Sequence, residues 1–133
     1  TRCGLLPGAL GHNASGHFQC EWVQLHAPAS RCVWTTDLES IECPIAHGEG
    51  RYVHPDIDSL FSAGQVALTY RTNPNGSTRD IAGVCDPTGV VLGLMPHPEN
   101  HVLARQHPRH ARGAGRGLAL ALFSNGVRHA STQ

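Results

Sequence analysis

The sequence has no lysine, a single methionine, few aromatic residues and no excess of charge of either sign. Its ten basic residues are all arginines and are balanced by ten acidic residues. Arginine suits bidentate contacts to phosphate, but a neutral chain lacks the electrostatic attraction on which nucleic-acid binding depends. No apolar run approaches the roughly 20 residues of a membrane-spanning helix, and no charged-then-apolar leader opens the chain. We therefore expect a protein that binds neither nucleic acid nor membrane.

The cysteines do not occur in pairs of the kind that bind zinc or form a disulfide framework. They are odd in number and include no C-x-x-C spacing, so the sequence predicts neither a zinc ribbon nor a disulfide framework. We expect reduced, mostly buried thiols in a cytoplasmic protein, so that the two N-x-S sequons at Asn13 and Asn75 are chance matches. The five residues are Cys3, Cys20, Cys32, Cys43 and Cys85.

Histidine is abundant, but its spacing does not predict a metal centre. His97 with His101, and His107 with His110, have separations that could place two ligands on one helical face. The prolines and glycines among them disfavour such a helix. We therefore expect no metal site.

Length and composition fit one globular domain with a buried core, since 40% of the 133 residues are hydrophobic and 15% are charged. Alternating or continuous apolar runs predict strands, and Gly and Pro mark the turns between them. Residues 4–8 have the pattern of a helix end followed by a turn. Helices are predicted at 55–64 and 117–129, and strands at 18–25, 32–34, 41–46, 65–70, 81–85 and 90–95, the last two joined as a hairpin through 86–89.

The most informative motif begins inside the last predicted strand and continues as Pro96-His97-Pro98-Glu99. Proline ends the strand because it cannot donate to the ladder, so His97 and Glu99 leave the sheet together. A histidine held by a carboxylate is the base and orienting group of a nucleophilic triad. The alternative is a strand exit with a surface histidine and a solvated glutamate.

This motif resembles the C-terminal signature of the class I (triad-type) glutamine amidotransferases. Four further sequence blocks resemble one branch of this family, the glutaminase subunits of phosphoribosylformylglycinamidine synthase, which act in purine biosynthesis. The similarity extends from about residue 4 to 130. The blocks are GLLPGAL at 4–10, PIAHGEGRY at 44–52, NPNGS at 73–77 and IAGVCDPTG at 81–89.

The resemblance implies an α/β protein with the flavodoxin-like class I glutamine amidotransferase fold. Residues 1–133 would form a single, partial domain, the C-terminal portion of that fold, with a mixed sheet that includes an antiparallel hairpin. A sheet without its N-terminal strands would leave apolar residues such as Val23, Leu25, Ile45 and Val66 short of neighbours.

The resemblance also implies roles for individual residues. His97 and Glu99 match the family's catalytic histidine and glutamate, while the G-x-C-x-G-x-Q elbow that carries the nucleophilic thiol is absent from this sequence. Cys3 precedes a block that in relatives follows the elbow by about one helix, so it is a poor candidate for the nucleophile. Cys85 lies at a hairpin turn with no helix N-terminus to lower its pKa, so we expect it to pack in the core.

The loop at His47-Gly48-Glu49 is the second candidate site. Glycine allows a backbone to approach a ligand closely, and the resemblance implies that these three residues lie beside the glutamine pocket. The alternative is a plain Gly-rich turn after a strand.

By resemblance, the chain is part of a subunit that hydrolyses L-glutamine and supplies ammonia, and is inactive as given because it lacks the thiol. Its expected partners are a large synthetase subunit, which would hold ATP and Mg²⁺, and a small accessory subunit; this chain itself needs no cofactor. The Arg-rich segment between Arg105 and Arg116 could bind phosphate or nucleic acid, but we favour a solvated loop that faces the synthetase. The alternative function is a non-catalytic docking or regulatory domain that kept the fold and lost the elbow.

Overall fold

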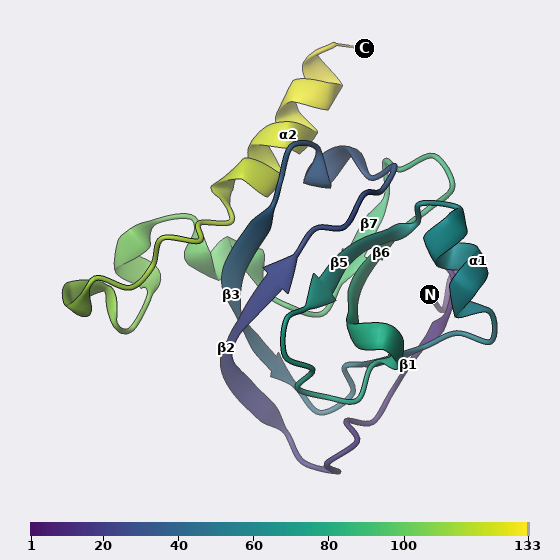
Figure 1. The fold of residues 1–133 in the computed structure, drawn as a ribbon, viewed down its shortest axis with the longest axis horizontal. Coiled ribbons are helices and arrows are strands. Elements are labelled where there is room, and N and C mark those ends of the chain that lie inside the picture. Colours follow the sequence, from purple (N-terminus) through teal and green to yellow (C-terminus); the bar gives the residue numbers. More distant parts are fainter. Residues whose placement is uncertain (133) are drawn as a thin grey trace.

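The computed structural model describes residues 1–132, and its centre is a five-stranded sheet in the order β3-β2-β5-β6-β7 (Figure 1). A separate two-stranded ribbon joins β1 to β4. The strands are β1 Ala9–Gly11, β2 Gln19–His26, β3 Ser40–His47, β4 Arg51–Val53, β5 Val66–Tyr70, β6 Ile81–Cys85 and β7 Leu92–Leu94; the α-helices are α1 Ile57–Ser62 and α2 Leu120–Ser131. Short 3₁₀ helices occupy Val33–Thr35, Thr78–Asp80, Pro98–His101, Ala104–Gln106 and His110–Arg112.

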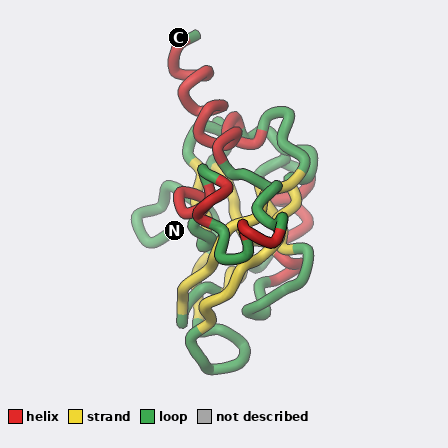
Figure 2. The backbone as a smooth tube through the Cα atoms, turned by 90° about the vertical axis from the view of Figure 1, so that its left-hand side faces the viewer, coloured by secondary structure: helices red, strands yellow, loops and turns green. Residues whose placement is uncertain are grey.

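Most of the predicted elements are present close to their expected bounds. The strands predicted at 18–25, 41–46, 65–70 and 81–85 are β2, β3, β5 and β6, and the two predicted helices are α1 and α2. Helix α1 begins after Asp56, whose carboxylate caps it by accepting a hydrogen bond of 3.1 Å from the Ser59 amide. In Figure 2 the strands fill the middle of the molecule, and α2 extends away from them to the C-terminus.

The predicted β6–β7 hairpin is confirmed, and Asp86 organises its turn. The Asp86 carboxylate accepts hydrogen bonds from the amides of Thr88 and Val91 and from the Thr88 hydroxyl. These bonds lower the pKa of Asp86 to about 2, the Thr88 hydroxyl contributing most. Because the turn uses Val90 and Val91, β7 is shorter than the predicted strand at 90–95. It is also half-buried rather than buried, since it is the outer strand on its side of the sheet.

Two local predictions were wrong. Residues 32–34 do not form a strand, because both the amide and the hydroxyl of Thr35 bond to the Cys32 carbonyl and close a 3₁₀ turn over Val33–Thr35. Residues 4–8 form a series of bends and contain no helix end. Gly4 and Gly8 have φ of 77° and 83°, a region that glycine enters freely.

The sheet confirms the α/β class with an antiparallel hairpin, but it differs from the mixed sheet that the resemblance implies. Every strand pair within residues 1–132 is antiparallel. The pairs β2–β3, β5–β6 and β6–β7 are each consecutive in the chain, whereas parallel neighbours need a long crossover.

The core is filled from within this chain. One cluster joins β2, β3 and the start of α2 through Leu25, Ile45 and Leu122, and a second packs α1 against β5 and β6. Strand β6 contributes to both clusters, and all five of its residues are buried. The expectation that four apolar residues lack neighbours was therefore wrong: Val23, Leu25, Ile45 and Val66 are 7%, 1%, 0% and 1% exposed.

Three of the five thiols, those of Cys32, Cys43 and Cys85, are buried, and Cys3 and Cys20 are exposed. This confirms that most of the thiols are buried. Within residues 1–132 no helix combines the length and the apolar character that crossing a membrane requires.

The contact between α2 and Trp34 generates a prediction about stability. A Cβ at Gly126 would lie 2.3 Å from Trp34 Cζ3, and the indole is fixed by a hydrogen bond of 2.7 Å from Nε1 to the Val90 carbonyl. Replacing Gly by Ala within a helix usually stabilises by about 1 kcal/mol. We expect Gly126→Ala to destabilise instead, by about 1–3 kcal/mol, because the methyl group overpacks this contact.

Equilibrium urea unfolding would measure this difference. Ser124→Ala, on the exposed side of the same helix, serves as the matched control and should change stability by no more than about 0.5 kcal/mol. A midpoint for Gly126→Ala at or above that of the unsubstituted protein would show that Trp34 moves freely.

Candidate active site

The structure brings His97 and Glu99 together at the surface beyond β7. His97 Nδ1 lies 2.9 Å from Glu99 Oε1, and the side chains are 42% and 56% exposed. The amide of His97 donates a hydrogen bond of 2.8 Å to the carbonyl of Pro44 on β3. The dyad is therefore attached to the sheet by its backbone while its side chains remain accessible.

The hydrogen bond selects how the imidazole can act. Glu99 accepts from Nδ1–H, which leaves Nε2 unprotonated in the neutral ring. Nε2 has no hydrogen-bond partner within the described residues, so it can take a proton from a group that approaches from solvent. This is the arrangement of a general base with an orienting carboxylate; the catalytic roles of the two residues stay a prediction.

An apolar wall stands beside the dyad. A groove of about 300 Å³ is lined by His97 and Glu99 on one side and by Leu94, Leu122 and Phe123 among its apolar residues. A larger groove of about 760 Å³ lies elsewhere, between the edge of the sheet and residues 113–117. We place the candidate site at the smaller groove, because it contains the paired imidazole and carboxylate.

The loop predicted to contact substrate lies at the end of β3, and its residues differ in accessibility. The His47 imidazole is buried, with Nδ1 3.0 Å from Asn13 Oδ1 and Nε2 3.5 Å from Asn75 Nδ2. Gly48 is half-buried, and Glu49 is exposed, with Oε1 3.6 Å from His12 Nδ1. A ligand would therefore meet Gly48 and Glu49, while His47 lies behind them.

The electrostatic environment of His47 includes the dyad. Burial lowers the pKa of His47 below its ordinary value, and the charge that His97 can carry lowers it further. The hydrogen bond from the His97 amide to the Pro44 carbonyl places the dyad beside β3, three residues before that strand ends at His47. The two candidate sites therefore adjoin the same strand, although 48 residues lie between Gly48 and His97 along the chain.

The thiols of Cys43 and Cys85 are not in the environment of an activated nucleophile. Cys43 adjoins Pro44, but burial, and then the charges of Glu99 and Glu42, raise its pKa to about 12. Burial likewise raises the pKa of Cys85 to about 12, and its predicted place in the core is confirmed. Because the thiolate is the reacting form, neither cysteine is suited to attack. Cys3 is exposed and lies outside any strand-to-helix elbow.

No three histidine, cysteine or carboxylate side chains converge on a possible metal position within the part of the chain that the structure describes. Of the histidines weighed as ligands, His97 is paired with Glu99. His101 Nδ1 instead contacts the carbonyl of Glu42.

Sequence reasoning missed Asn13 and Asn75, which it set aside as chance sequons. Both are buried, at 3% and 1% exposure, and both contact the loop that follows β3. Asparagine is a residue that is usually exposed, so its burial could not be inferred from composition. The Asn-Pro-Asn-Gly-Ser run was the available signal, because asparagines in turns often bond to nearby backbone.

Comparisons with known proteins identify the family of the chain. Residues 6–130 match the family model of the CobB/CobQ-like glutamine amidotransferase domain. A phosphoribosylformylglycinamidine synthase subunit PurQ from Treponema denticola is 40% identical over 90% of this chain and 52% of its own length. The protein of the same name from Parasynechococcus marenigrum is 50% identical over 74% of this chain and 48% of its own length.

A solved structure supports the fold as well. A chain in "Structure of PurLQS from Thermotoga maritima" superposes with a TM-score of 0.75 at 39% identity, over 95% of this chain and 54% of that one. The chain thus spans about half the length of the relatives it matches. These relatives confirm the narrower resemblance inferred from the sequence. With almost all of its length matched by the family model, the chain belongs to the CobB/CobQ-like glutamine amidotransferase domain family.

Proposed function

We propose that this chain is part of the glutamine-hydrolysing, ammonia-supplying subunit of a phosphoribosylformylglycinamidine synthase. The observation that carries the proposal is the hydrogen bond of 2.9 Å between His97 Nδ1 and Glu99 Oε1, with Nε2 accessible. Membership of the glutamine amidotransferase family supports glutamine hydrolysis as the reaction in which the dyad acts. Relatives named as PurQ subunits of phosphoribosylformylglycinamidine synthase support that synthase as the complex.

The dyad would move the protons of the reaction. A thiol gives its proton to His97 Nε2 and attacks the side-chain carbonyl carbon of glutamine, which forms a tetrahedral intermediate. The imidazolium then returns the proton to the leaving nitrogen, so that ammonia departs and a thioester remains. Water, deprotonated by the same imidazole, then attacks the thioester; the thiolate leaves and takes the proton back from the imidazolium, which releases glutamate and restores the thiol. Glu99 keeps the ring oriented and stabilises its positive charge in both steps.

The thiol itself would come from outside these residues. The G-x-C-x-G-x-Q elbow is absent from the sequence. The raised pKa values of Cys43 and Cys85 make these two thiols unsuitable as the nucleophile. The same observation supports a second candidate, a docking or regulatory domain that kept the fold and lost the elbow. The coding sequence that precedes Thr1 distinguishes the two: an elbow there supports the enzyme, and a gene without one supports the docking domain.

The partners follow from the same assignment. Ammonia would pass to a large synthetase subunit that holds ATP and Mg²⁺, with a small accessory subunit in the complex, in the cytoplasm. The similarity to a chain in the Thermotoga maritima PurLQS structure supports an assembly of this kind.

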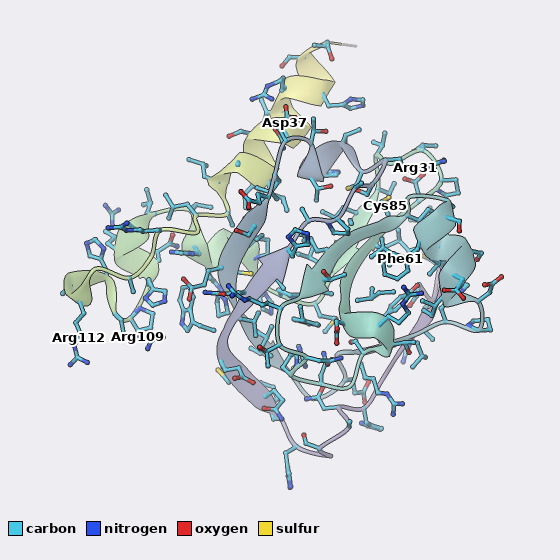
Figure 3. All side chains as sticks on the ribbon, in the orientation of Figure 1. Arg31, Asp37, Phe61, Cys85, Arg109 and Arg112 are labelled. Carbon is cyan, nitrogen blue, oxygen red and sulfur yellow. The ribbon has the colours of Figure 1, made fainter. Side chains whose placement is uncertain are left out.

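A basic surface on this chain is suited to such a partner. Residues 100–133 contain five of the ten arginines and none of the ten acidic residues. Figure 3 shows Arg109 and Arg112 at the tip of a segment that projects from the body of the protein. Arg105, Arg109 and Arg112 are exposed and form no ion pair within residues 1–132. A partner with an acidic surface would complement this segment.

The roles of the dyad can be tested in the full-length protein assembled with its synthetase partner. We expect His97→Ala to lower the glutamine-dependent rate by about 10³-fold, and Glu99→Ala to cost less, because Glu99 acts only through the imidazole. Synthesis with added ammonia should survive both substitutions. His129→Ala, on α2, is the control. Near-normal glutamine-dependent activity of His97→Ala would exclude His97 as the base.

The chain 1–133 by itself should release no ammonia from glutamine. An imidazole–carboxylate pair without a thiol cannot form the covalent intermediate. A coupled ammonia assay on the purified chain measures this. Ammonia release that disappears in Cys3→Ala or in Cys43→Ala would contradict the prediction and identify the nucleophile.

The basic segment should contribute to assembly. We expect Arg109→Ala combined with Arg112→Ala to weaken binding to the synthetase subunit by about tenfold at low ionic strength and less at high salt, since exposed charges are screened. Arg2→Ala, at the other end of the chain, is the matched control. Titration calorimetry at two salt concentrations gives both values, and equal affinities for variant and unsubstituted protein at low salt would place the interface elsewhere.

A further inference from the structure

Three buried polar side chains lie together beneath the loop between β3 and β4. Asn13, His47 and Asn75 are 3%, 5% and 1% exposed and come from three segments far apart in the sequence. In Figure 1 the loop is the turn at the lower end of β3, where the chain continues toward the small ribbon of β1 and β4. Buried polar groups are costly unless they are hydrogen-bonded, so the partners of these side chains define what the cluster does.

Asn13 uses its whole amide on this loop and its surroundings. Its Nδ2 donates to the carbonyls of His47 and His17, at 2.7 and 2.8 Å. Its Oδ1 accepts from the Gly50 amide at 3.2 Å and lies 3.0 Å from His47 Nδ1. Its own backbone amide donates to the Gly48 carbonyl at 2.8 Å. Asn13 thus bonds to the backbone of His47, Gly48 and Gly50.

Asn75 holds the far end of the loop. Its Nδ2 donates to the Gly50 carbonyl at 2.9 Å and lies 3.5 Å from His47 Nε2. Its Oδ1 accepts from the amide and the hydroxyl of Ser77, at 3.0 and 2.7 Å. Ser77 therefore fixes the asparagine in the orientation that presents its donor to the loop.

These partners determine the state of His47. Nδ1 faces the acceptor Asn13 Oδ1 and so carries the proton, while Nε2 faces the donor Asn75 Nδ2 and so carries the lone pair. Burial, which lowers the pKa of His47, favours the same neutral ring. Gly50 rests on this ring, because a Cβ there would lie 2.3 Å from Nδ1. The imidazole of His47 therefore packs directly against Gly50 and supports the loop from beneath.

The network leaves one part of the loop free. The carbonyls of His47, Gly48 and Gly50 and the amide of Gly50 are all directed toward Asn13 or Asn75. The amides of Gly48 and Glu49 donate to no group within residues 1–132, and both residues reach the surface. Two adjacent N–H donors of the loop thus have no partner among residues 1–132, and they follow the strand to which the His97 backbone is bound.

We propose that Asn13 and Asn75 are positioning residues which, together with the neutral His47, hold the loop from Gly48 to Gly50 so that its free amides face glutamine. This inference rests on the proposed function and adds two asparagines to it. None of the three side chains touches the substrate; they act through the loop backbone. Loss of any one should weaken glutamine binding more than it slows the chemical step.

The test uses the full-length protein in its complex, with glutamine and, separately, ammonia as nitrogen donor. Asn75→Ala and His47→Leu should raise KM for glutamine about tenfold and change kcat less than about threefold, while ammonia-dependent synthesis stays unchanged. His47→Asn should keep KM within about threefold of the unsubstituted value, because the Asn amide can donate from the position of Nδ1. An equal rise in KM for His47→Asn and His47→Leu would overturn the proposal.

A matched control separates positioning from general destabilisation. Asn125 on α2 is also buried, and its Nδ2 also holds two backbone carbonyls, those of Trp34 and Thr36. Asn125→Ala should lower stability and leave KM for glutamine unchanged. If it raises KM as much as Asn75→Ala does, the loop is not the cause and the proposal is wrong.

A second measurement is independent of activity. Amide hydrogen exchange at Gly50 should be about tenfold faster in Asn13→Ala than in the unsubstituted protein, because the acceptor of that amide is removed. Unchanged exchange would overturn the inference, whatever the activity. A complex that uses ammonia but never glutamine, while Gly50 exchange responds as expected, would instead overturn the proposed function and leave the loop network standing.

Discussion

The outer edge of β3 is the constraint on which the rest of this structure depends. Strand β3 is the last strand of the sheet on its side, so alternate residues present their backbone groups away from β2. At Glu42 the amide donates to the Gly117 carbonyl at 2.8 Å, and the carbonyl accepts from His101. At Pro44 there is no amide, and the carbonyl accepts from His97. An edge that could pair with another chain is instead used to bind the C-terminal segment.

Because the edge of β3 binds the C-terminal segment, it brings His97 near a loop that is distant from it in the sequence. The bond from the His97 amide to Pro44 fixes the dyad beside the sheet, and the same strand ends at His47, where the loop begins. One strand therefore sets the separation between His97 and the loop. Proline suits this place, because a proline in a sheet is tolerated where its missing donor would point away from the neighbouring strand.

Strand β3 also separates a buried thiol from the exposed dyad. Between two residues that bind the C-terminal segment lies Cys43, whose side chain is fully buried in the core. Its thiol is held protonated by burial and by nearby carboxylates, so Cys43 is poorly suited to be a nucleophile although its strand lies beside the His97–Glu99 dyad. Near this strand the chain has an exposed imidazole with its carboxylate beside an apolar groove, and two loop amides that donate to no group within residues 1–132.

Local chemistry in the sequence determined much of this protein. Apolar runs bounded by Gly and Pro located β2, β3, β5, β6 and both helices, and Asp-Pro-Thr-Gly located the hairpin turn, since these signals act within a few residues. The spacing of His97 and Glu99 predicted their pairing for the same reason. Only the tertiary structure decided that residues 32–34 curl into a 3₁₀ turn, that every strand pair is antiparallel, and that Asn13 and Asn75 meet His47. Those outcomes depend on hydrogen bonds between groups far apart in the chain, and no local pattern specifies the partner of such a bond.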